Sequence, residues 1–187
     1  FLKKLRKKYQ FFLFSLLILL NFFYGASNWR LYASDSLRAS ILFDNAMEKY
    51  KDKDFEGAIQ DLDKYIEIYP NDHKYGYFNR GIIKDRIKDY KGAIKDYNKA
   101  LNLYPSSKKY LKARSISKLF LENYKGALKD INKALLLDSI NPNFFKIKGM
   151  ILSKKGDTKK ACNALKKSIE LGSEDEKTID FLISFCK

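Results

Sequence analysis

The sequence contains few of the residues that carry most enzyme and metal chemistry: one histidine, two cysteines and one tryptophan among 187 residues. The histidine, His73, follows Pro70-Asn71-Asp72 in a predicted turn. No cysteine, second histidine or pair of carboxylates is spaced to join it in a metal site or a catalytic pair. Glycine-rich phosphate loops and nucleophile elbows are also missing from the sequence. We therefore expect no enzyme activity, cofactor, metal or small-molecule substrate.

Basic residues outnumber acidic ones, 37 to 22, which gives a net charge of +15 at pH 7. Residues 1–38 hold seven basic residues and one acid, so +6 of that charge lies there and +9 on the rest. Beyond residue 38 the lysines alternate with acids along helix faces, which is typical of solvated surfaces and argues against a nucleic-acid partner. A basic surface that binds anionic membrane lipid or nucleic acid is the alternative function.

The first 27 residues have the pattern of a targeting segment. Five basic residues between Lys3 and Lys8 precede the apolar run Phe11–Phe23, as in a secretory signal. Thirteen helical residues span about 20 Å, less than the roughly 30 Å hydrocarbon core. A longer run through Ala26, with Trp29 at the interface, would make a single-span anchor.

Two interpretations of residues 1–27 therefore stay open: a signal peptide cleaved after Ser27, or an uncleaved anchor. In both cases the flanking charge predicts that residues 30–187 lie outside the cytoplasm, either exported (periplasmic or secreted) or anchored to the membrane. Residues 28–38 are predicted to be a polar linker. Within it, Ser34, Asp35 and Ser36 offer a helix N-cap.

A repeat of about 34 residues organises the rest of the chain. Its clearest copy is Asp89–Pro105, which has an aromatic residue at the helix start, small residues inside the helix and a proline stop. The alanine of this copy recurs at spacings of 35, 34 and 34 residues: Ala58, Ala93, Ala127 and Ala161. A fixed period of this length is the signature of a helical repeat array.

Other positions repeat in phase with these alanines. Twelve residues earlier comes a small residue that lets two helices approach closely: Ala46, Gly81, Ser115 and Gly149. Four residues later comes a large one: Leu62, Tyr97, Ile131 and Leu165. Apolar residues follow a 3.6-residue period throughout, with no strand-like alternation. Each unit is therefore predicted to be two helices joined by a short turn.

This succession of small, aromatic, alanine and proline positions resembles the tetratricopeptide repeat (TPR) family over residues 39–172. The resemblance implies an all-α, right-handed α-solenoid of four helix-turn-helix units and a C-terminal capping helix. The implied bounds are 39–72, 74–107, 108–141 and 142–173 for the units, and 174–187 for the cap. No unit carries the family's tryptophan, Tyr65 stands where a small residue is usual, and the fourth unit is the loosest.

The two cysteines fall near the end of this array. Consecutive helices of such an array run antiparallel, which would bring Cys186, at the end of the cap, beside Cys162 in the preceding helix. In an exported protein such a pair is expected to form a disulfide. Two buried thiols are the alternative.

The resemblance also implies where a partner would bind, because the family lines a concave groove with its first helices. The residues predicted for that groove are Phe43, Met47, Tyr75, Phe78, Ile82, Lys109, Lys112 and Lys146. Apolar anchors with lysines suit an extended or helical peptide of some acidic character, although Phe78, Ile82 and Ile116 could instead be core.

The TPR proteins that clamp a chaperone's terminal carboxylate use a set of lysine, asparagine and arginine residues. Only Asn79 and Lys109 match that set, while Phe43, Met47 and Ala113 occupy the other positions. Chaperone tails are therefore not the expected ligand. The predicted function is a non-catalytic protein–protein interaction scaffold, with the membrane as a further partner if the N-terminal segment is retained.

Overall fold

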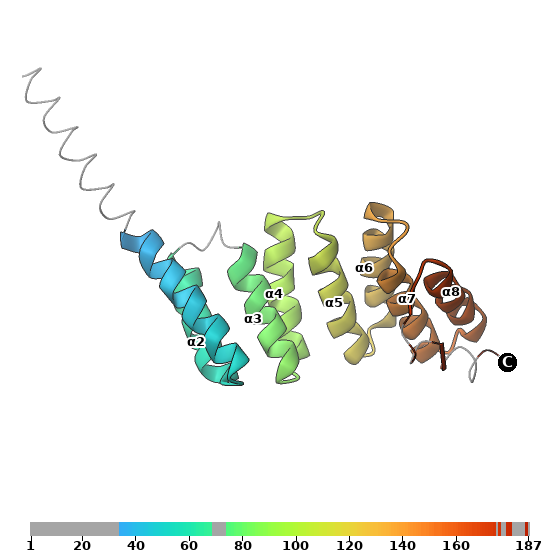
Figure 1. The fold of residues 1–187 in the computed structure, drawn as a ribbon, viewed down its shortest axis with the longest axis horizontal. Coiled ribbons are helices and arrows are strands. Elements are labelled where there is room, and N and C mark those ends of the chain that lie inside the picture. The colour runs from blue at the N-terminus through green and yellow to red at the C-terminus, as the bar shows by residue number, and fades with distance from the viewer. Residues whose placement is uncertain (1–33, 69–73, 175, 177–178, 181–185, 187) are drawn as a thin grey trace, which may run out of the picture.

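A computed structural model describes residues 34–68, 74–174, 176, 179–180 and 186, and within these ranges every regular element is a helix. The predicted signal or anchor segment and His73 lie outside the described residues. The helices stand side by side in a row, each antiparallel to the next (Figure 1). Their bounds are 34–51, then α2 (Phe55–Ile68), α3 (Lys74–Arg86), α4 (Tyr90–Leu103), α5 (Lys108–Phe120), α6 (Tyr124–Leu137), α7 (Pro142–Lys154) and α8 (Thr158–Glu170).

Each repeat is a pair of these helices, which confirms the predicted helical repeat fold. The first helices are 34–51, α3, α5 and α7, and each packs against the second helix of its own unit. The first helices α3, α5 and α7 also contact one another along the array. The predicted linker is wrong over residues 34–38, because these residues are already helical. Serine and aspartate cost only a few tenths of a kcal/mol within a helix, so Ser34, Asp35 and Ser36 extend the helix instead of capping it.

The four phased alanines are fully buried, as their spacing predicts. Opposite them, the small residues of the first helices permit the close approach of each helix pair. A Cβ on Gly81 would lie 2.6 Å from Tyr97 Cε1, and one on Gly149 would lie 2.6 Å from Leu165 Cγ. These glycines are therefore packing residues of the repeat.

The turn between the two helices of a unit also repeats. A residue with positive φ, such as Lys88 (64°), comes directly before the N-cap. The N-cap carboxylate of Asp89 then accepts a hydrogen bond of 2.9 Å from the Gly92 amide. A Cβ on Gly92 would lie 2.0 Å from Asp89 Oδ2, so a larger residue there would force the capping carboxylate to shift.

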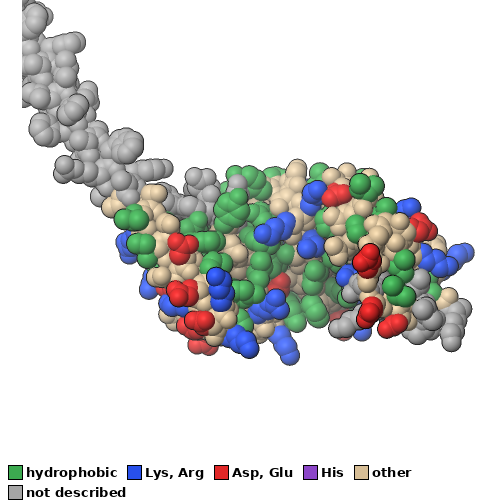
Figure 2. All heavy atoms as spheres, in the orientation of Figure 1, with side chains coloured by type: hydrophobic (Ala, Val, Ile, Leu, Met, Phe, Trp, Pro, Cys, Tyr) green, Lys and Arg blue, Asp and Glu red, His purple; other side chains and the backbone are tan. Residues whose placement is uncertain are grey.

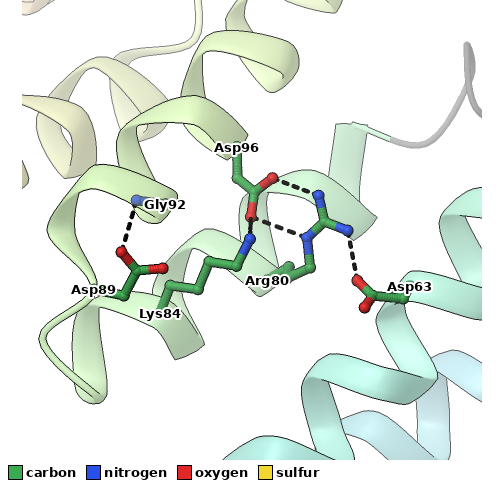
Figure 3. A network of polar contacts seen from close by, with 6 residues as sticks. All are labelled: Asp63, Arg80, Lys84, Asp89, Gly92 and Asp96. Carbon is green, nitrogen blue, oxygen red and sulfur yellow. Dashed lines mark hydrogen bonds and ion pairs between the residues drawn. The ribbon is translucent and has the colours of Figure 1, made fainter.

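Buried ion pairs join the first and second helices of the middle repeats (Figure 3). Asp96 of α4 is only 3% exposed and accepts hydrogen bonds from Arg80 Nε at 2.9 Å and Lys84 Nζ at 2.8 Å. Arg80 also donates to Asp63 of the preceding unit at 2.6 Å. Burial opposes the charge of Arg80, but its bonds to Asp96 and Asp63 outweigh burial and raise its pKa.

The same arrangement recurs one repeat later. Asp130 of α6 accepts from Arg114 Nε at 2.8 Å and from Lys118 Nζ at 2.7 Å, and Arg114 reaches back to Asn98 at 2.7 Å. In the first unit a single pair remains, between Lys49 and Asp61 at 2.6 Å. We call this series of carboxylates and their cations the ion-pair ladder.

The end of the array is held by a disulfide between Cys162 of α8 and Cys186, whose Cα atoms are 5.7 Å apart. This confirms the predicted pairing. Glu176, Ile179 and Asp180 are helical, while most of the predicted capping helix, 174–187, falls outside the described residues and stays a prediction.

Candidate peptide-binding groove

A hollow of about 580 Å³ opens between the first helices α3 and α5, with α4 behind them. On the face of the array shown in Figure 2, hydrophobic side chains gather along the middle with lysine and arginine side chains among them. Four of the eight predicted groove residues line the hollow: Phe78, Ile82, Lys109 and Lys112. The other lining residues are Asp85, Arg86, Lys88, Tyr90, Tyr97, Ala113, Ile116 and Phe120.

The spacing of these residues explains why they meet. Phe78, Ile82 and Asp85 are four and three residues apart on α3, so they share one helix face. Lys109, Lys112, Ile116 and Phe120 do the same on α5. Because α3 and α5 lie next to each other, the two faces form the two walls of one groove.

Phe78 forms the floor of the hollow and is only 2% exposed. Its ring lies 4.5 Å from that of Tyr110 and 5.8 Å from that of Tyr97, centroid to centroid. The prediction of Phe78 as a surface contact for a ligand is therefore wrong. Tyr110, at the start of the next first helix, covers the ring and makes Phe78 part of the core.

Basic side chains form the rim. Lys109 is exposed and places Nζ 4.6 Å from the centroid of the Phe78 ring, a cation–π contact. Lys112 is half-buried beside it. Arg86 donates from Nε to the Tyr50 hydroxyl of the first unit at 3.1 Å, and Lys88 completes the basic set.

Asp85 is the one acid that lines the hollow, and its oxygens are already engaged. It accepts hydrogen bonds from the Tyr97 hydroxyl at 2.7 Å and from Ser117 Oγ at 2.7 and 3.0 Å. Burial raises the pKa of Asp85 above its ordinary value, and the bonds from Tyr97 and Ser117 oppose that shift. Burial and the bond to Asp85 raise the pKa of Tyr97 in turn.

An aromatic pair that sequence reasoning missed stands at one end of the hollow. Tyr90 and Phe120 stack with centroids 4.7 Å apart and planes 7° apart, while Phe120 remains 60% exposed. The repeat alignment accounts for Tyr90 only as the aromatic residue at the helix start. Phe120 is the last residue of α5, and the sequence alone does not show that its ring is exposed.

The remaining predicted groove residues lie elsewhere along the array. Phe43 and Met47 are half-buried against the core of the first unit, where the Phe43 and Tyr65 rings are 5.4 Å apart. Tyr75 is exposed on the first turn of α3. Lys146 lies on α7, one repeat beyond the hollow. The structure thus brings together the middle of the predicted set and leaves its two ends apart.

Within the part of the chain that the structure describes, no group of histidine, cysteine and acidic residues is arranged to hold a metal ion. The same described residues include no helix that is both long and apolar enough to span a membrane.

Family models of the tetratricopeptide repeat match residues 75–107 and 147–173. A comparison with curated proteins finds no significant sequence match. MamA from Desulfovibrio magneticus is similar in structure at 19% identity and a TM-score of 0.72, over 78% of this chain and 81% of that chain. A TPR protein from Parabacteroides merdae is similar at 17% identity and a TM-score of 0.69, over 79% and 66%.

A third similar structure is the first TPR of Spaghetti (RPAP3), bound to the HSP90 peptide SRMEEVD. It is 23% identical with a TM-score of 0.61, over 65% of this chain and 95% of that chain. At these identities the likeness establishes the fold. The two repeats matched directly fall in the second and fourth predicted units, and the other units share their helix pairs and phased alanines. The chain is a tetratricopeptide repeat protein.

Proposed function

We propose that this chain is a non-catalytic scaffold that binds a peptide segment of a partner protein in the hollow between α3 and α5. The observation that carries the proposal is the charge of that hollow. Four cations, Arg86, Lys88, Lys109 and Lys112, line it against the single acid Asp85, which is satisfied by Tyr97 and Ser117. The acidic side chains of a ligand could pair with these cations. Asp85 would not compete for them, because its carboxylate already accepts hydrogen bonds from Tyr97 and Ser117.

The apolar surface defines the rest of the ligand. Ile82, Ile116 and the exposed face of Phe120 offer aliphatic and aromatic contact between the cations. Such a surface suits a peptide that alternates an apolar anchor with acids. The HSP90 peptide bound by the similar domain of Spaghetti has two glutamates and one aspartate among its seven residues, which supports an acidic ligand here without identifying it.

The test is a screen of a random peptide display library against the full chain in neutral detergent. Enriched peptides are expected to carry acids beside an apolar residue. The paired reversal Lys109→Glu/Lys112→Glu should abolish binding, since it makes the rim acidic. The control is Lys95→Glu/Lys99→Glu, the same charge change on two exposed lysines of α4 outside the hollow. Equal loss in both double variants would contradict a groove ligand. Phe78→Ala is unsuitable because it removes a core residue.

Salt distinguishes this function from binding to an anionic surface. A ligand with apolar anchors should keep much of its affinity as the salt concentration rises. Binding that depends only on the net charge of the array should weaken steeply. At 0.1 M salt the screening length is about 10 Å, and attraction between exposed charges that are farther apart is largely lost. A steep loss together with insensitivity to Phe120→Ala would favour the anionic-surface alternative.

We also propose that the array works outside the cytoplasm, exported or anchored by residues 1–27. The basic cluster before Phe11–Phe23 supports a targeting role. The pairing of Cys162 with Cys186 agrees with an oxidising compartment, where disulfides persist. N-terminal sequencing of the native protein distinguishes a cleaved signal, with a start near Asn28, from a retained anchor. Two thiols that label without reductant in that protein would contradict the export proposal.

A further inference from the structure

The ion-pair ladder stops before the fourth repeat. Its carboxylates Asp61, Asp96 and Asp130 are 35 and 34 residues apart, and the next position in the series is Ala164. The lysine of the third unit, Lys118, is replaced by Leu152 at the corresponding place. The arginine position retains a cation, Lys148, on α7. The fourth unit therefore keeps one cation of the ladder and lacks the carboxylate that such a cation meets in the units before it.

A pocket of about 480 Å³ lies at this interruption, between α6, α7 and α8. Its lining residues are Leu128, Asn132, Phe145, Lys148, Leu152, Lys155, Asp157, Lys160, Asn163, Ala164 and Lys167. Asn132 is the counterpart of Asn98, which accepts from Arg114 in the intact ladder. The pocket thus occupies the place where the preceding units bury their ion pairs.

The charge of the pocket is positive, because four lysines line it against one acid. That acid, Asp157, is paired with Lys160 at 2.9 Å, and Lys167 pairs with Glu170 at 3.0 Å. Lys148 is half-buried, and the acids of the pocket region, Asp157 and Glu170, are paired with Lys160 and Lys167 instead. A partly buried ammonium is stabilised by a carboxylate partner, as Lys84 and Lys118 show in the ladder.

The pocket is separate from the hollow between α3 and α5. Lys148 follows Lys146 by two residues, which places their side chains about 200° apart around α7. Lys146 belongs to the face predicted for the concave groove, so Lys148 points to the opposite side. In α3 the ladder residue Arg80 likewise lies two residues from Phe78 and from Ile82, the groove residues.

We propose that this pocket binds a glutamate or aspartate side chain of a partner protein, which takes the place that Asp96 and Asp130 hold in the second and third repeats. The surrounding apolar residues, Leu128, Phe145 and Leu152, contact an apolar neighbour of that acid. The array then has two ligand sites on opposite faces, and both are selective for acidic segments.

The test uses a fluorescein-labelled peptide that alternates glutamate with leucine, and the same peptide with glutamine for glutamate. Binding to the full chain in neutral detergent is measured by fluorescence anisotropy. All proteins carry Lys109→Glu/Lys112→Glu, which prevents binding of the peptide in the hollow between α3 and α5. The result for the pocket therefore does not depend on whether the hollow is a ligand site. The glutamate peptide should bind more tightly than the glutamine peptide, and Lys148→Ala should weaken that binding roughly tenfold.

Ala164→Asp is the decisive variant, because it restores the carboxylate of the ladder within the chain. It should lower the affinity for the glutamate peptide as much as Lys148→Ala does, while Tm stays at or above that of the parent. Lys166→Ala removes an exposed lysine of α8 outside the pocket and should change nothing. If Ala164→Asp fails to fold, the test depends on the difference in peptide affinity between Lys148→Ala and Lys166→Ala.

Three results would overturn the proposal. One is equal affinity for the glutamate and glutamine peptides. A second is an equal effect of Lys148→Ala and Lys166→Ala, which would indicate attraction by net charge only. The third is displacement of the peptide by inorganic phosphate or glycerophosphoserine with the same dependence on Lys148, which would make the pocket a phosphate or lipid-headgroup site.

Discussion

The second and third repeats join their two helices through a buried aspartate, and at the same position the fourth repeat has an alanine. In the second repeat Asp96 is clamped by Arg80 and Lys84. At the corresponding place the fourth repeat has Ala164 and Lys148, and a disulfide close by at Cys162. Helices α3 to α8 are each 13 or 14 residues long and every unit has the buried alanine, so the backbone of a unit does not require the ion pairs.

The turn within each unit shows the same contrast. In the third repeat, as in the second, the N-cap side chain bonds a glycine amide at 2.9 Å, from Gly126 to Asn123. In the fourth, Lys160 stands in place of that glycine, and its amide is 3.3 Å from Asp157 Oδ1. The middle repeats have a neighbour on both sides and are constrained by both. In the last repeat the cap is longer, and Lys148 lines a pocket where the carboxylate of the ladder is replaced by Ala164.

The largest expected effect comes from breaking the ladder where it is complete. Asp96→Ala leaves Arg80 and Lys84 without their shared carboxylate, and both side chains are at least four-fifths buried. Removal of one partner from a buried pair costs about 3–5 kcal/mol. We expect about 4 kcal/mol of lost unfolding free energy, measured from the midpoint of urea unfolding followed by circular dichroism.

Two variants control that measurement. Asp63→Ala removes the half-exposed partner of Arg80 and should cost less than about 1 kcal/mol, since exposed pairs contribute little. Ala164→Asp adds a carboxylate to the fourth repeat and should leave the midpoint unchanged or raise it. A loss of similar size in Asp96→Ala and Asp63→Ala would mean that burial of the carboxylate does not matter.

The second effect belongs to the fourth repeat. Reduction of the disulfide frees a loop of 24 residues, which the chain-entropy model values at about 3 kcal/mol. In an array whose repeats contact only their neighbours, the loss should stay local. Amide hydrogen exchange is therefore expected to accelerate in α7 and α8 and to remain unchanged in α3 and α4. Uniform acceleration along the array would show that the end repeat stabilises the middle.

Much of the fold could be predicted because residues with the same packing role recur in each of the four repeats. Ala58, Ala93, Ala127 and Ala161 are each fully buried, as their phase requires. The disulfide could be predicted because the antiparallel order expected of such an array would bring Cys186 back to Cys162, and the two residues are bonded. These inferences depend on which residues occupy equivalent positions in successive units, which a fixed period determines.

The candidate site was harder to predict, because a period does not say how deeply a side chain is covered. Phe78 is at a groove position but is covered by Tyr110 from the next unit. Phe120 was missed because its exposure depends on where α5 ends. The interruption at Ala164 is visible in the sequence, but its meaning required the ion pairs of Asp96 and Asp130 to be seen in the preceding units.

The smallest effect is a contrast in pH dependence between Asp85 in the hollow and Asp157 in the fourth repeat. Burial raises the pKa of Asp85 above its ordinary value of 3.8. The native state then holds the proton more tightly than the unfolded state. The contribution of Asp85 to stability is therefore largest below pH 3.8 and falls as the pH rises through its native pKa.

Asp157 should behave in the opposite way, since its hydrogen bond from Lys160 lowers its pKa below 3.8. Its contribution is present above pH 3.8 and is lost as the pH falls through its native pKa. We expect Asp85→Asn to make the pH profile of stability rise more steeply between pH 3 and 6, and Asp157→Asn to flatten it. Urea midpoints over this range, with Asp44→Asn as an exposed control, measure both. If both variants change the slope of stability against pH in the same direction, burial does not dominate the pKa of Asp85. The carboxylate of Asp85 would then be more solvated than its hydrogen bonds to Tyr97 and Ser117 indicate.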